Sequence, residues 1–302
     1  MRTLYRRIGV LILILTVNIF AGDAGNTGLS FLKIGVGAPA AGMGNAYTAV
    51  ATDGLAGYWN PAGLMGAPRS NVVFTHTVWL FDAVSEFAAL QFRGKRSSLA
   101  LHLYSFYIGE IPVRLIPSAQ PLGTTSAQYL STGISYARRW NDRLAVGATV
   151  KYLYEKIYIE TATGWAVDLG LRYRVPGKPL VLAATLQHLG TMNALVSQAS
   201  TLPTLVRVGM LLAPQRRIGP LRVRFALDGV RYLSAGWRLN SGLEFLLGRQ
   251  LILRTGYLAG YAEQSLAFGF GFRKATLRLD YSFTPFAAGL GDVHRFSLYL
   301  AL

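Results

Sequence analysis

Histidine is the side chain that most often acts as a general acid or base near neutral pH, and this sequence holds four: His76, His102, His188 and His294. We expect His102 on an inward face of the fold, but no nucleophile can be placed beside it from the sequence. The chain has no cysteine, which excludes a thiol nucleophile and a cysteine-ligated metal. No spacing of possible ligands is typical of a metal site. We therefore predict a protein that is not an enzyme and that uses no cofactor and no metal.

Two glycine pairs, Gly35-x-Gly37 and Gly42-x-Gly44, could belong to a phosphate-binding loop. They do not follow a strand of a βαβ unit, and no Gly-Lys-Ser/Thr sequence comes after them. The stretch around them, Phe31–Leu64, is rich in Gly and Ala and shows neither a helical stripe nor a strand alternation. We therefore interpret these glycines as sites of close packing, where a positive φ is also tolerated.

Charged residues alternate with apolar residues along much of the later sequence. Between 221 and 228, for example, apolar residues hold the odd positions, while Arg222, Arg224 and Asp228 hold three of the even ones. Such charges are costly against lipid, so we expect them on the inner wall of a barrel. Two interpretations stay open: a salt-bridge network that holds a plug, or a path for a substrate. The candidate lumen charges are Lys151, Asp168, Arg172, Arg207, Arg222, Arg224, Asp228, Arg254, Arg278 and Asp280.

The elements that must position these residues are strands about ten residues long. Alternation with a period of two predicts fourteen of them. They lie near 71–80, 85–93, 97–107, 126–138, 143–156, 163–174, 180–189, 203–213, 220–228, 237–247, 250–257, 263–273, 275–284 and 293–302.

The connections between these strands distinguish a barrel from a β-sandwich, which would alternate in the same way. Short connections, such as 139–142, alternate with longer ones, such as 108–125, 157–162 and 190–202; the short connection near 81–84 is the exception. This is typical of an outer-membrane barrel with short periplasmic turns and longer outer loops. Closure also removes the exposed edges of a wide open sheet. We therefore predict an all-β transmembrane antiparallel barrel of about 14 strands with both barrel termini in the periplasm.

Composition agrees with this fold. Of the 302 residues, 52% are hydrophobic and only 15% are charged, which a lipid-facing outer wall accommodates. The net charge of +16 would favour nucleic acid in a soluble protein. Here the basic residues lie in turns and on alternate strand positions, so we predict no nucleic-acid partner. They concentrate at the short turns, where they could contact lipid phosphates or form a docking ring for an acidic periplasmic partner.

The first residues indicate export. Arg2, Arg6 and Arg7 precede an apolar run that ends near Ala21-Gly22, which predicts a signal peptide over residues 1–21. An uncleaved membrane anchor is the alternative, although the apolar run is short for a membrane span.

The stretch FLKIGVGAPAAGMGNAYTAVATDGLAGYWNPAGL, with its motif Trp59, Asn60, Pro61, Ala62 and Gly63, resembles the N-terminal signature of the PorV/PorQ family, relatives of the FadL-type fatty-acid channels. The end of the chain is similar as well, over Tyr281–Phe286 and Leu290–Leu298. Two departures are Pro39, where a basic residue is expected, and Leu302, where such barrels usually end in an aromatic residue.

This resemblance implies a fourteen-stranded barrel with an N-terminal hatch inside the lumen, and so a hatch over residues 22–68 and a barrel over 69–302. It implies a place in the outer membrane and a role as a component or accessory of type IX protein secretion. The alternative is a FadL-like gated channel for hydrophobic small molecules such as fatty acids. The partners implied are outer-membrane lipid, and either secretion-machinery proteins or secreted cargo, or a hydrophobic ligand.

Overall fold

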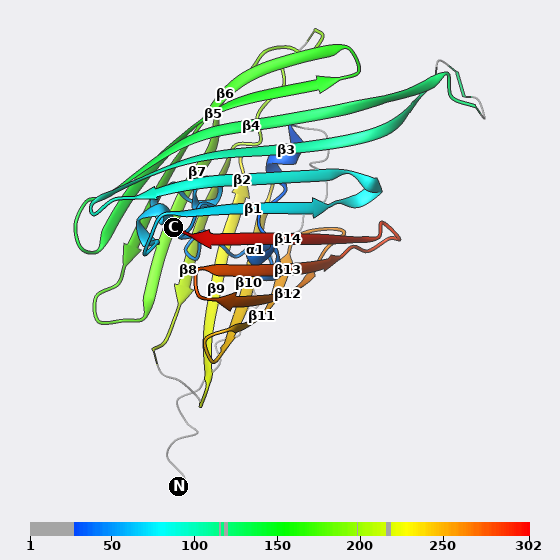
Figure 1. Ribbon diagram of the computed structural model, residues 1–302. Helices are drawn as coiled ribbons and strands as arrows, with labels where there is room; N and C mark the ends of the chain where they lie inside the picture. Colours follow the sequence, from blue (N-terminus) through cyan, green and yellow to red (C-terminus); the bar gives the residue numbers. More distant parts are fainter. Residues whose placement is uncertain (1–26, 115, 118–119, 198, 216–218) are drawn as a thin grey trace.

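The computed structural model describes residues 27–302 apart from 115, 118–119, 198 and 216–218, so the predicted signal peptide lies outside the described residues. Fourteen antiparallel strands form a closed barrel in which β1 pairs with both β2 and β14 (Figure 1). This confirms the all-β class, the strand number and the closure. The strands are β1 (Asn71–Val78), β2 (Val84–Arg93), β3 (Ser97–Val113), β4 (Gly123–Arg139), β5 (Leu144–Ile157), β6 (Glu160–Arg174), β7 (Leu180–Met192), β8 (Leu205–Leu212), β9 (Leu221–Tyr232), β10 (Trp237–Leu247), β11 (Leu251–Ala259), β12 (Leu266–Lys274), β13 (Leu277–Pro285) and β14 (Asp292–Ala301).

Two connections differ from the expectation. The strands β3 and β4 continue into the expected loop 108–125, because their ladder resumes after a bulge and extends to the pair of Val113 and Gly123. The expected long connection 157–162 is wrong, because Ile157 pairs with Glu160 and leaves a turn of Tyr158 and Ile159 alone. In both cases the backbone pairing between strands continues beyond the residues that alternate between apolar and polar types.

Side chains alternate between the two faces of the wall. On β9, Ala226, Asp228 and Val230 are buried, whereas the residues between them are partly exposed. Large apolar side chains elsewhere are exposed on the outward face, such as Phe268 and Phe270 on β12. The described residues include no helix that is both long and apolar enough to cross a membrane.

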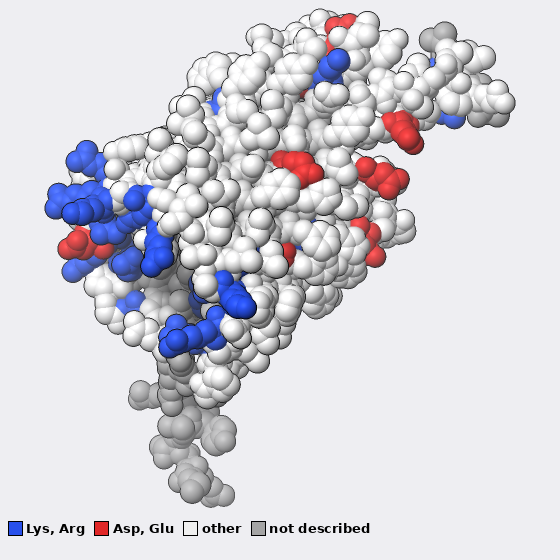
Figure 2. Space-filling view, viewed as in Figure 1, with Lys and Arg blue, Asp and Glu red and all other residues white. Residues whose placement is uncertain are grey.

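The end of the barrel where β1 begins and β14 ends carries the short turns, and we call it the short-turn rim. Figure 2 shows that lysine and arginine gather at this rim, on the left of the view. Asp142 is the acidic residue among the turns that the structure describes there. Two further arginines of the sequence, Arg216 and Arg217, lie outside the described residues. The basic residues of the described turns and their flanks are Arg93, Lys95, Arg96, Arg138, Arg139, Arg143, Arg174, Lys178, Arg249, Arg273 and Lys274.

Residues 27–70, which we call the N-terminal segment, precede the barrel and form short helical turns. They are η1 (Ser30–Lys33), α1 (Ala38–Gly42), α2 (Ala56–Trp59) and η2 (Pro61–Gly66); η3 (Leu80–Asp82) joins β1 to β2. Pro39 and Pro61 lie in the first turns of α1 and η2, where a missing amide hydrogen does no harm. Most of the segment is buried, and it packs against β3–β6 and β11–β14. It therefore lies against the inward-facing side chains of the strands.

We predict that Phe225→Arg lowers the free energy of unfolding in lipid vesicles by about 2–4 kcal/mol, because Phe225 lies outward near the middle of β9. Leu221→Arg is the matched control on the same strand and face. It lies at the short-turn rim, where the loss should be only about 0–1 kcal/mol. Denaturant titration of both variants measures the difference. Equal losses would contradict the assignment of this face to lipid.

Candidate functional site

The predicted motif Trp59-Asn60-Pro61 lies where the N-terminal segment meets the strands. Asn60 is fully buried, and its Nδ2 donates to the carbonyl oxygens of Thr48 at 3.2 Å and of Leu171, on β6, at 3.0 Å. Its Oδ1 accepts from the amide of Ala62 at 3.1 Å, which caps η2. One side chain thus ties together two parts of the segment and a strand. Ala62 and Gly63 follow within η2 and are buried.

Glycine residues of the strands lie opposite this motif. An added Cβ at Gly170 would lie 2.2 Å from Oδ1 of Asn60, and one at Gly147 would lie 2.5 Å from the carbonyl carbon of Pro61. Gly242 and Gly256 likewise face Met43 and Gly44 at distances under 3 Å. We call these four the wall glycines. The sequence analysis did not single them out, although glycine on an inward strand position is itself a sign that a backbone approaches closely.

The four glycines predicted for the segment are placed in similar contacts. A Cβ at Gly35 would lie 2.8 Å from the Trp59 ring, and one at Gly42 would lie 2.9 Å from Cα of Gly269 on β12. Gly37 and Gly44 have φ values of 90° and 60°, which a residue with a side chain rarely adopts. The structure therefore gives each of the four a steric reason to lack a side chain.

Trp59 is held by a hydrogen bond from its ring nitrogen and by a cation–π contact over its ring. Its Nε1 donates to the carbonyl oxygen of Val36 at 2.9 Å, and the guanidinium carbon of Arg207 lies 5.0 Å from the ring centroid. Arg207 is buried, and its Nε donates to Oε1 of Gln187 at 3.1 Å. The predicted lumen charge Arg207 thus holds an aromatic side chain of the N-terminal segment rather than an acidic one.

A buried polar cluster surrounds the neighbouring Tyr58. A bulge in the β6–β7 ladder turns both Gln187 and His188 inward; Gln187 donates to the carbonyl oxygen of Tyr58. Nζ of Lys151 and Oδ2 of Asp168 are 2.5 Å apart, and both side chains are almost fully buried. Burial raises the pKa of the Tyr58 phenol well above its usual value. The hydroxyl therefore stays protonated and donates to the segment's own carbonyl groups.

Asp228 holds the middle of the N-terminal segment. Its Oδ2 accepts from the amides of Tyr47 and Thr48, each at 2.9 Å, and from the Thr48 hydroxyl at 2.6 Å. The carboxylate is fully buried. Three donors on one carboxylate oxygen make this predicted lumen charge a backbone anchor.

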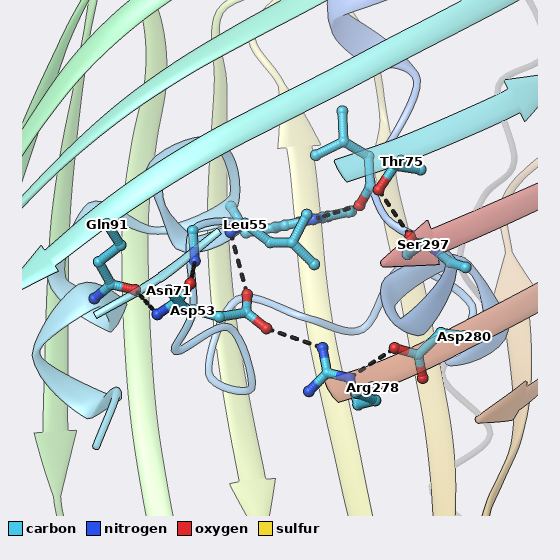
Figure 3. A network of polar contacts seen from close by, with 12 residues as sticks. Asp53, Leu55, Asn71, Thr75, Gln91, Arg278, Asp280 and Ser297 are labelled. Carbon is cyan, nitrogen blue, oxygen red and sulfur yellow. Dashed lines mark hydrogen bonds and ion pairs between the residues drawn. The ribbon is translucent and has the colours of Figure 1, made fainter. Parts of the chain in front are cut away.

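A ladder of alternating charge joins the segment to β13 and its neighbours. Nη2 of Arg278 lies 3.0 Å from Oδ2 of Asp53, and its Nε lies 2.6 Å from Oδ2 of Asp280 (Figure 3). Asp280 also pairs with Arg254 at 2.7 Å, and Arg254 pairs with Glu244 at 2.8 Å. Asp53 was not predicted, because nothing in its local sequence distinguishes it from a turn residue.

The other predicted lumen charges lie toward the short-turn rim. Arg224 pairs with Glu244, Arg222 is exposed, and Arg172 is half-buried. A cleft of about 680 Å³ opens at this rim and is lined by Arg69, Arg224, Arg273, Arg278 and Asp53, among others. The structure therefore divides the predicted charges into a buried interior set, which contacts the N-terminal segment or other strands, and a more exposed set toward the rim.

The four histidines are far from forming one site. His102 stacks on Phe87 at 5.8 Å, whereas His188 lies beside Lys151. His76 and His294 lie on the outward face of β1 and β14. Among the residues that the structure describes, no group of three or more His, Asp and Glu side chains is arranged to hold a metal ion.

We predict that Gly170→Ala destabilises the contact with Asn60, because the new Cβ meets Oδ1 at 2.2 Å. Overpacking of this kind costs about 1–3 kcal/mol. Hydrogen exchange of residues 56–66 should therefore become faster. Gly236→Ala is the control, since nothing lies within 4 Å of its added Cβ. Unchanged exchange in Gly170→Ala would show that the contact is not tight.

Comparisons with known proteins bear on both parts of the chain. Residues 22–170 match the family model of the type IX secretion system protein PorV. No curated protein matches. The CymD monoaromatic hydrocarbon channel superposes with a TM-score of 0.62 at 14% identity, over 89% of this chain and 98% of that one. The P. putida toluene transporter TodX superposes with a TM-score of 0.62 at 12% identity, over 89% of this chain and 99% of that one.

A Pseudomonas aeruginosa FadL homologue superposes with a TM-score of 0.53 at 12% identity, over 86% of this chain and 96% of that one. At such identities the likeness concerns the fold alone, which is that of a FadL-like outer-membrane channel. The N-terminal segment with its Trp59-Asn60-Pro61 motif lies inside the range of the family match. Residues 22–170 are therefore similar to the PorV family, and the barrel as a whole has a FadL-like fold.

Proposed function

We propose that the protein is a component or accessory of type IX protein secretion. The observation that carries this proposal is the PorV family match over residues 22–170, which spans the N-terminal segment and the strands from β1 into β6. The basic short-turn rim supports it, because a concentrated positive charge favours encounter with an acidic partner. The partners proposed are secretion-machinery proteins or secreted cargo, together with outer-membrane lipid.

We further propose that residues 22–68 act as a hatch within the barrel of residues 69–302, after removal of a signal peptide over 1–21. The burial of the N-terminal segment supports this division, as do its bonds to Leu171, Asp228 and Arg278. The short-turn rim is proposed to face the periplasm, with both barrel termini there.

A second candidate function is the uptake of hydrophobic small molecules. The observation that favours it is the fold shared with hydrocarbon channels such as CymD and TodX. The lining of the rim cleft counts against it, because apolar ligands prefer sites lined mainly by apolar side chains and this cleft is lined by several arginines.

Deletion of the gene in the source bacterium should leave secreted cargo trapped in the periplasm, as detected by fractionation and immunoblotting.

An Asn60→Ala, Pro61→Ala double variant separates the two functions, because it removes the bonds to Thr48 and Leu171. If the protein is a secretion component, uptake of a long-chain apolar probe should not change. A change in probe uptake by this variant while secretion stays normal in the deletion strain would favour the channel. The control is heat-modifiability on gels, which shows that the barrel is folded.

The orientation is tested with protease-cleavage tags in two connections. A tag in 193–204, between β7 and β8, should be cut on intact cells, whereas a tag at Gly177 in the β6–β7 turn should not be cut. Gly177 has open space around it, so the insertion should not disturb packing. Cleavage of the second tag alone would show that the orientation is the opposite of the one proposed.

A further inference from the structure

The ladder of alternating charge beside β13 is electrically neutral. It joins three arginines to three carboxylates, and each of them pairs with at least one partner of the opposite sign. The members of the ladder are Arg224, Arg254 and Arg278, with Glu244, Asp280 and Asp53. Every carboxylate of the ladder is thus already engaged, so any other basic side chain beside it adds a surplus positive charge.

Two such arginines line the rim cleft. Arg69 lies in the connection between η2 and β1, and Arg273 lies on β12. Among the residues that the structure describes, neither forms an ion pair with a carboxylate. Arg273 is moreover the cross-strand partner of Arg278. Like charges directly opposite each other destabilise a sheet, and an anion bound between the two guanidinium groups offsets that cost.

A second basic hollow adjoins this cleft. It has a volume of about 550 Å³, and Arg273 and Ala275 line both the cleft and the hollow. Arg222, Arg249 and Lys274 also line the hollow, whereas none of the described residues that line it is acidic. We call the cleft and the hollow together the rim groove, which extends from the N-terminal segment to the β10–β11 turn. Figure 2 shows how lysine and arginine gather at this end of the barrel.

The arginines of the groove lie on the inward face of the wall. On β12, Phe272 is exposed on the outward face, so the next residue, Arg273, lies on the inward face. On β13, Leu279 is outward in the same way and Arg278 is inward. The wall therefore separates these guanidinium groups from the headgroups of the surrounding lipid. An anion reaches them from the water beyond the rim.

The size of the groove favours a chain with several negative charges over a single small anion. The cleft and the hollow each lie in the range of about 300–1,000 Å³ that is typical of sites for ligands much larger than phosphate. The cations are also spread across the mouth, because the four strand spacings from β9 to β13 amount to about 19 Å. An extended peptide of about six residues covers this length. Carboxylates recur along an acidic peptide, and arginine binds them in a bidentate manner.

We propose that the rim groove binds an acidic, extended segment of a polypeptide. Its carboxylates pair with Arg69 and Arg273 in the cleft and with Arg222, Arg249 and Lys274 in the adjoining hollow. This inference names the chemistry of the partner, and so it deepens the proposed secretion role and rests on it. Binding of the segment is measured on the purified protein, so the site and the role are tested separately.

The test uses the full mature chain in nanodiscs of phosphatidylcholine, a lipid without net charge. The probe is fluorescein-labelled hexaglutamate, whose binding is followed by fluorescence anisotropy. An Arg69→Gln, Arg273→Gln double variant should bind the probe about tenfold more weakly, because it removes two charge-assisted bonds. It breaks no ion pair of the ladder, so the fold should be kept. Arg222→Gln, which changes an exposed side chain of the hollow, should also weaken binding and serves if the double variant folds poorly.

The matched control is Lys95→Gln with Arg96→Gln. It removes the same charge from the exposed β2–β3 turn, which belongs to the same rim but lies outside the groove. Its affinity for the probe should stay within about twofold, because salt screens charges that are not in contact with the peptide. Hexaglutamine of the same length should not bind. An unchanged affinity in the groove double variant would overturn the proposal, as would an equal loss in the control.

Two competition experiments identify other occupants. If inorganic phosphate displaces the probe at an equal concentration of charge, the groove is a site for a small anion. If phosphatidylglycerol in the nanodiscs abolishes binding of the probe, the arginines reach lipid headgroups. Either result would overturn the peptide assignment.

The site and the secretion role fail in different experiments. Cargo that is trapped in the deletion strain, together with no binding of the probe, would contradict the groove alone. Binding of the probe together with normal secretion in the deletion strain would contradict the secretion role and would leave the groove as a peptide site.

Discussion

The close approach of the N-terminal backbone to the inward face of the strands is the constraint on which the rest of the structure depends. A Cβ on Gly256 would lie 1.9 Å from the amide nitrogen of Gly44, so neither backbone could keep its place if that strand position carried a side chain. At this distance backbone groups lose access to water, and each must find a partner in the protein. Asn60 and Asp228 supply such partners, as do the capping bonds of the short helical turns.

This constraint also determines how the charged side chains of the wall are distributed. Where the segment covers the wall, several buried charges are paired, as in Arg254 with Glu244 and Asp280, because an unpaired buried charge is strongly destabilising. Asp228 is held by backbone amides instead, and Arg207 by the Trp59 ring. Toward the short-turn rim the cover ends, and arginines such as Arg222 are exposed to solvent. The same strands therefore carry a neutralised interior and a positive rim.

Much of the fold could be predicted from the sequence because alternation is a local property. The two faces of β9 follow from the residue types at 221–228 alone, and fourteen such segments require closure. The turn at Tyr158 and the long β3–β4 ladder could not be predicted, since they depend on pairing across strands. For the site, residue types indicated inward charges, but not that Arg207 would meet Trp59 or that Asp53 would meet Arg278. Those partners come from distant parts of the chain.

The distribution of these contacts bears on what the N-terminal segment can do. It is held at Asn60 by β6, at Thr48 by β9 and at Asp53 by β13, so a movement of the whole segment must break bonds on three strands together. Hydrogen bonds to charged groups contribute about 1.5–3 kcal/mol each, so the charged contacts at Thr48 and Asp53 alone make spontaneous opening rare. A ligand shifts the equilibrium between the bound and the released N-terminal segment only by the difference in its affinity for these two states. A partner that opened the barrel would therefore have to replace these bonds, and the arginines at the rim, near Arg278, are where an acidic group could begin to do so.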